Sequence, residues 1–110
     1  MAMFRALSGN GGGGGSFNDI GTALTNNGFT QTSATDSFTA VAGKTYLFVY
    51  FIGSSRTPGI VSGADVLGES TILRSDISEI LYIGLIKATS TTVTFSGPCV
   101  NYKNWNCQLD

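Results

Sequence analysis

Residues 45–52, TYLFVYFI, limit most strongly what this chain can fold into. Thr, Tyr, Phe, Val and Ile favour strands because their bulky or β-branched side chains pack well on a pleated, partly buried surface. Side chains alternate between the two faces of a strand, and here both faces are apolar. This segment is therefore predicted to be a strand covered on both sides, and 80–86 repeats the pattern.

Similar stretches recur along the chain, separated by turn residues. Val93 and Phe95 alternate with Thr92 and Thr94, which predicts a strand with one buried and one solvated face. The predicted strands are 37–42, 45–52, 60–67, 70–75, 79–88, 91–97 and 99–109. Seven to eight short strands with turns between them predict an all-β fold, an antiparallel β-sandwich or jelly roll.

The segment before the first of these strands has two interpretations. Ile20, Thr22 and Leu24 alternate up to Asn27-Gly28, a dipeptide that favours the tight turn of a β-hairpin. We therefore predict a short first hairpin. The alternative is a helix over 18–27, capped by Asn18 and stopped by Gly28.

Five consecutive glycines, Gly11–Gly15, divide the chain into an extended N-terminal arm, 1–16, and a β-sandwich domain, 17–110. Ordering glycine costs roughly 1 to 2 kcal/mol of backbone entropy per residue. Each large apolar side chain returns about 1.5 to 3 kcal/mol when it is buried. The arm is therefore expected to dock onto a neighbouring subunit through its four large apolar residues, which are Met1, Met3, Phe4 and Leu7.

The low charge of the chain argues against two classes of partner. Only 12% of the residues are charged, the net charge is −1, and the six basic residues are scattered singly. Nucleic-acid binding depends on clustered Lys and Arg, so we expect no nucleic-acid partner. The longest apolar run, 46–52, has the length of a strand, and we expect no membrane partner. The leader 1–7 lacks the apolar core of a secretory signal.

The residues offer little for catalysis. The chain has no histidine, the commonest general base and a frequent metal ligand. Two pairs of nearby carboxylates remain, Asp65 with Glu69 and Asp76 with Glu79. Both pairs fall in predicted loops among polar residues, where solvated surface acids are the simpler interpretation. We expect no enzymatic activity, no metal and no cofactor.

Cys99 and Cys107 bracket the segment VNYKNWN. A hairpin over this segment would bring the two residues near the separation that a disulfide requires, a Cα distance below about 7 Å. We expect them to be close together without an obligatory bond.

Two doubly apolar strands in a two-layer sandwich would leave an apolar patch exposed, unless the arm or another copy covers it. The sequence therefore predicts a homo-oligomer, with a trimer as the first expectation. The predicted contact residues are Val49, Phe51, Leu81 and Ile83. The alternative is that one strand end is tucked under the loop 53–59.

The segment NYKNWN combines aromatic rings with amide groups, as glycan-binding surfaces do. Tyr102, Trp105 and Asn104 are the candidate glycan contacts. The alternative is that Trp105 plugs one end of the sandwich while the asparagines make a turn.

The leader MAMFRAL, the polyglycine run, and a β domain containing DSFTAVAGKTYLFVYF and TTVTFSG together resemble small structural proteins of tailed bacteriophages and prophages. The resemblance lies in this layout across most of the chain. It implies a virion component assembled in the host cytoplasm, either a capsid decoration protein or a tail or fibre protein, with other virion proteins as partners. A carbohydrate-binding or adhesin-like module and a monomeric host-cell domain are the alternatives.

Overall fold

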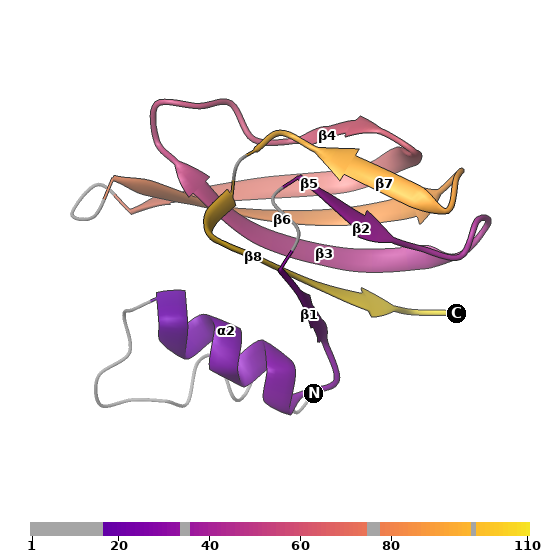
Figure 1. Cartoon of the computed structure of the whole chain (residues 1–110), viewed down its shortest axis with the longest axis horizontal. Helices are drawn as coiled ribbons and strands as arrows, with labels where there is room; N and C mark the ends of the chain where they lie inside the picture. Colours follow the sequence, from indigo (N-terminus) through magenta and orange to yellow (C-terminus); the bar gives the residue numbers. More distant parts are fainter. Residues whose placement is uncertain (1–16, 34–35, 75–77, 98) are drawn as a thin grey trace.

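The computed structural model describes residues 17–33, 36–74, 78–97 and 99–110, with the backbone alone at 17–19, 74 and 99–103. Within these ranges, one short helix accompanies eight strands in two antiparallel sheets, so the predicted all-β sandwich is confirmed (Figure 1). The elements are α2 (Phe17–Asn26), β1 (Thr30–Thr32), β2 (Ser37–Thr39), β3 (Thr45–Gly53), β4 (Ile60–Ser62), β5 (Ala64–Arg74), β6 (Glu79–Ala88), β7 (Thr92–Phe95) and β8 (Cys99–Gln108).

The larger sheet has the strand order β1-β8-β3-β6-β5, and the smaller sheet has the order β2-β7-β4. β3 is central in the larger sheet, between β8 and β6. Its ladder with β6 runs without interruption from Thr45 opposite Lys87 to Gly53 opposite Glu79. A central strand is shielded by neighbours on both sides, so its environment depends on the layers that cover its two faces.

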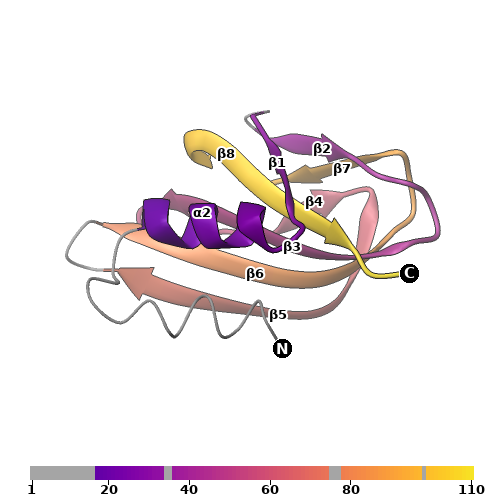
Figure 2. The same cartoon turned by 90° about the horizontal axis from the view of Figure 1, so that it is seen from below.

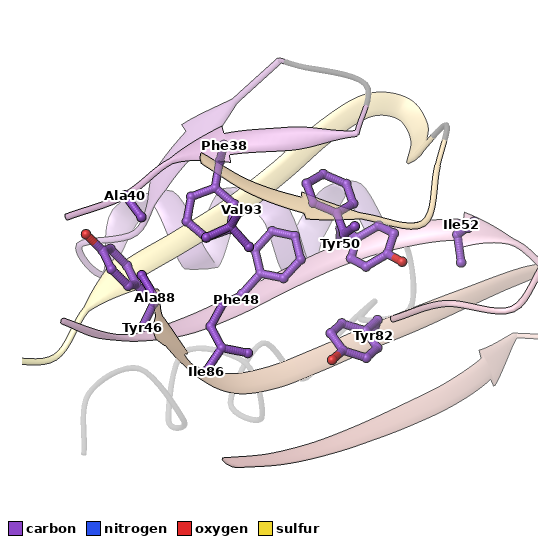
Figure 3. Close-up of a cluster of buried hydrophobic side chains, with 11 residues drawn as sticks. Phe38, Ala40, Tyr46, Phe48, Tyr50, Ile52, Tyr82, Ile86, Ala88 and Val93 are labelled. Atoms are coloured by element: carbon purple, nitrogen blue, oxygen red, sulfur yellow. The ribbon is translucent and has the colours of Figure 1, made fainter. Parts of the chain in front are cut away.

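The first core fills the space between the two sheets (Figure 3). β3 contributes Phe48 and Tyr50, both fully buried, and the ring of Phe95 on β7 lies 4.8 Å from Phe48 and 4.6 Å from Tyr50 between centroids. Val93 is also buried, whereas Thr92 is exposed. The alternation predicted for this strand is confirmed.

The second core lies on the opposite face of the larger sheet, under α2 (Figure 2). The ring of Trp105 on β8 packs edge-on against Phe51 on β3, with centroids 5.2 Å apart. The buried members are Leu24, Phe29, Val49, Phe51, Leu81 and Trp105. The described chain therefore has three layers: a helix, a five-stranded sheet and a three-stranded sheet.

The hairpin predicted around Asn27-Gly28 is wrong, and the alternative helix is present as α2. Gly28 has φ 93°, and its N–H donates to the Thr25 carbonyl, while the Phe29 N–H donates to the Leu24 carbonyl. This pair of bonds is the Schellman arrangement that ends a helix. Leu24 and Phe29 both lie in the second core, so packing reinforces the helix end. No helix in the described ranges is long and apolar enough to cross a membrane.

The strands predicted at 60–67 and 70–75 divide differently in the structure. β4 ends at Ser62, and β5 then runs without a break through Gly68 and Glu69 to Arg74. The chain changes sheets at Gly63, which has φ 87°, and a Cβ there would collide with the Thr92 carbonyl. Glycine is therefore required at this corner.

The expected proximity of the two cysteines is also wrong. β8 is one strand from Cys99 to Gln108, not a hairpin. Cys107 pairs with Leu47 and Cys99 pairs with Ile52, five residues apart on β3. At about 3.3 Å per residue this places the cysteines roughly 16 Å apart, beyond the reach of a disulfide.

Candidate self-association surface

β5 forms one edge of the larger sheet and pairs with β6 alone in the described structure. It is eleven residues long, whereas the other edge strands, β1, β2 and β4, have three residues each. An edge strand presents a row of backbone N–H and C=O groups that can pair with another chain, and natural edges are commonly short. The length of β5 makes it the most extensive free edge among the described strands.

The same strand carries half of the exposed large apolar residues in the described part of the chain. Four of its side chains are between two-fifths and two-thirds exposed, and Leu85 on the neighbouring β6 is 37% exposed. We call these four residues the β5 edge: Val66 (42%), Leu67 (57%), Ile72 (50%) and Leu73 (61%). Contiguous exposed apolar side chains mark interaction sites more often than single ones do.

The apolar side chains of β5 occupy both of its faces. Val66 pairs with Ile86 and Leu73 pairs with Ile80, so both lie on the face of the first core. Ile72 pairs with Leu81 and lies on the face of the second core. Figures 1 and 2 show the arrangement around β5: the smaller sheet lies over one side of the larger sheet, α2 lies over the other side beside β8 and β3, and β5 is the last strand of the larger sheet.

A β-bulge interrupts the ladder between β5 and β6 at Leu67. Val66 is opposite Ile86 and Gly68 is opposite Leu85, so Leu67 is the extra residue. A bulge bends its strand and redirects the neighbouring side chains. From Gly68 to Arg74 the ladder with β6 is regular, which leaves a bulge-free segment of the edge.

The middle of β5 is fixed from the inside by a tyrosine. The hydroxyl of Tyr82 on β6 donates to Glu69 Oε1 at 2.8 Å. Burial, and then the bond to Glu69, raise the pKa of the Tyr82 hydroxyl above its ordinary value. Asp65, the residue that the sequence places near Glu69, pairs with Lys87 and lies on the opposite face of β5. These two carboxylates therefore do not form a pair.

The predicted oligomer contacts Val49, Phe51, Leu81 and Ile83 belong to the interior of one chain. The first three are at most 5% exposed, and Ile83 is half-buried against the same cluster. The prediction erred because it assumed a two-layer sandwich, whereas α2 supplies a third layer over these residues. The exposed apolar side chains of the β5 edge are the better candidate for self-association.

The predicted glycan contacts are also displaced from the surface. Trp105 is 4% exposed and Asn104 is fully buried, so neither can stack on or hydrogen-bond a sugar in solvent. Trp105 fills the space between α2 and the sheet, at the position of Gly21. The side chain of Tyr102 lies outside the described side chains, and so do the predicted arm contacts Met1, Met3, Phe4 and Leu7.

The chain matches no protein-family model, no curated protein and no solved structure. The β5 edge is therefore interpreted from its own geometry. Sequence reasoning missed it because the two strands predicted here, 60–67 and 70–75, were separated at Gly68-Glu69. The available signal was a pair of adjacent apolar residues on each side of this segment, because adjacent residues on a strand point to opposite faces.

Proposed function

We propose that this protein is a non-enzymatic structural protein of a bacteriophage particle, assembled in the host cytoplasm. It self-associates through its β domain and docks onto another virion protein through its N-terminal arm. Its place in the particle would be that of a capsid decoration protein or a tail or fibre component. The observation that carries this proposal is the β5 edge, on a long strand that pairs on one side only among the described strands and exposes apolar side chains on both faces.

Soluble proteins usually protect such edges with lysine, proline or a covering loop. β5 contains neither lysine nor proline, and its protective features are the bulge at Leu67 and the acidic residues Asp65 and Glu69. The exposed leucines and isoleucine on it would favour contact with another protein surface at the high local concentrations of an assembling particle. A structural role in an assembly accounts for a long edge strand with exposed apolar side chains.

The arm supplies the second contact in this proposal. The described fold begins with α2, whose Leu24 is already part of the second core. The described residues supply all the members that the structure gives for both cores, and in this proposal the arm 1–16 binds an external partner. Burial of Met1, Met3, Phe4 and Leu7 against that partner would roughly offset the entropy of ordering Gly11–Gly15.

The carbohydrate-binding alternative is weakened, because two of its three predicted contacts, Trp105 and Asn104, are buried. A sugar-binding site needs an exposed aromatic face, and the ring of Trp105 is buried between a helix and a sheet. We therefore favour assembly over glycan binding.

The proposal is tested by following the full chain and a truncation that begins at Ser16 into particles purified from lysates of cells carrying the gene. Mass spectrometry should detect the full chain in particles and should not detect the truncated chain. The truncated chain should keep its thermal unfolding midpoint, because both cores lie within 17–110. Full chain found only in the soluble lysate would overturn the proposal, and a truncation that unfolds would show that the arm belongs to the fold.

A further inference from the structure

We propose that β5 pairs antiparallel with β5 of a second copy, about a twofold axis through Ser70, so that the two larger sheets become one continuous sheet. This inference rests on the proposed self-association and names its geometry. It replaces the expected trimer with a twofold dimer as the basic unit.

The faces of β5 follow from its register with β6, because residues directly opposite each other in an antiparallel pair point to the same face. Before the bulge, Asp65 faces the second core side and Val66 faces the first core side. After the bulge the parity shifts by one, so the even-numbered positions share the face of Asp65. Those positions are Gly68, Ser70, Ile72 and Arg74.

A second β5 strand must also match same-face residues with one another. A twofold rotation about Ser70 pairs same-face residues on both sides of the bulge, provided that Leu67 is also left unpaired in the new ladder. Gly68 then lies opposite Ile72, Val66 lies opposite Leu73, and Asp65 lies opposite Arg74. A register centred on Thr71 instead places Glu69 opposite Leu73 and Gly68 opposite Arg74.

The register about Ser70 is chemically complementary. It pairs the apolar side chain of Val66 with that of Leu73, and at each end it places an acidic residue, Asp65, across from a basic one, Arg74. Cross-strand apolar pairs and opposite charges both stabilise antiparallel sheets. At the centre two Ser70 residues meet, and serine is small enough for the close approach of two copies.

The described part of the molecule leaves room for this contact. α2 packs against β8, on the other side of β3 from β5, and both views show β5 at the outer margin of the larger sheet (Figures 1 and 2). A twofold axis perpendicular to the sheet keeps the two helices on one face and the two smaller sheets on the other. An edge contact buries less surface than a face-to-face interface, so the dimer should depend on concentration.

Disulfide trapping tests the register. Directly opposed residues have Cβ atoms about 4.5 to 5.5 Å apart, which permits a disulfide after a small adjustment. Ser70→Cys should therefore give a covalent dimer under mild oxidation. Asp65→Cys and Arg74→Cys should each stay largely monomeric when oxidised alone and should form a 65 to 74 link when mixed. The wild-type chain, oxidised in parallel, gives the background from Cys99 and Cys107, and peptide mapping assigns each link.

Sedimentation of the same samples separates the possible failures. A chain that associates but gives no link at 70, or that gives a link between two residues 65, overturns the twofold register and leaves self-association standing. A chain that stays monomeric at every concentration overturns both. Covalent dimers mapped to 70 with 70 and to 65 with 74 support the register.

Discussion

Tyr82 links the first core to β5. Its ring lies over Gly84, where an added Cβ would come within 2.8 Å of the ring and of the hydroxyl. Its hydroxyl reaches Glu69 on β5. Glycine at position 84 thus makes room for a buried tyrosine, and the tyrosine fixes the middle of an otherwise exposed strand.

Replacing this tyrosine should weaken the fold by a modest amount. Tyr82→Phe removes the hydrogen bond to Glu69 and keeps the ring, so the free energy of unfolding should fall by about 1 to 2 kcal/mol. Urea unfolding at neutral pH measures the change. In a double-mutant cycle, Glu69→Gln should weaken the fold less in the Tyr82→Phe background than in the wild type. Strictly additive effects would contradict a direct bond.

The same substitution should alter the response to alkaline pH. Burial and Glu69 raise the pKa of Tyr82 above its ordinary value of 10.0, so the folded protein keeps a proton that the unfolded chain releases above about pH 10. The free energy of unfolding therefore falls as the pH rises through this range. Tyr82→Phe lacks this titration and should show a flatter profile between pH 9.5 and about 11. Parallel profiles for the two proteins would contradict the raised pKa.

Among the elements, α2 decides how many layers the molecule has. Its alternating Ile20, Thr22 and Leu24 suggested a strand, yet Ile20 and Leu24 also lie four residues apart and share a helix face. Trp105 further stabilises the helix, because its ring packs against the helix backbone at Gly21. This tertiary contact could not be predicted from ten residues of local sequence.

Gly21→Ala measures that contact directly. Alanine normally stabilises a helix by about 1 kcal/mol relative to glycine. Here the new Cβ would lie 2.5 Å from the Trp105 ring, so we expect a loss of about 2 kcal/mol or more in chemical unfolding. Gly53→Ala is the matched control, because no atom lies within 4 Å of the Cβ it would add. An unchanged or higher stability for Gly21→Ala would contradict the close packing of α2 on Trp105.

The strands show which features of the sequence could be interpreted and which could not. The residues 45–52 and 91–97 predicted β3 and β7 well because their side-chain patterns are local properties of a strand. The same apolar pattern in β3 did not reveal whether α2 or a second copy covered its outer face. The length of β5 was also hidden, because a strand can cross Gly68 when a bulge accommodates it.

At the scale of the whole molecule, the covering layers are unevenly distributed over the larger sheet. α2 and the smaller sheet bury the two faces of β3, whereas on β5 Ala64 packs against the first core and the four residues of the β5 edge stay exposed among the described residues. The monomer is therefore complete in its two cores and incomplete at one edge. The proposed role in assembly would use this asymmetry, with the two cores holding the domain together and the β5 edge facing a neighbour.

Sedimentation of the full chain across a wide concentration range tests this account most directly. Leu73→Lys places a charge on the β5 edge, and Leu81→Lys places one in the second core. The wild-type mass should rise with concentration above the 11.5 kDa of one chain. Leu73→Lys should stay folded and sediment as a monomer, whereas Leu81→Lys should lose its fold, because an unpaired buried charge costs several kcal/mol. A wild-type chain that stays monomeric at every concentration, or a Leu73→Lys variant that associates as the wild type does, would contradict the account.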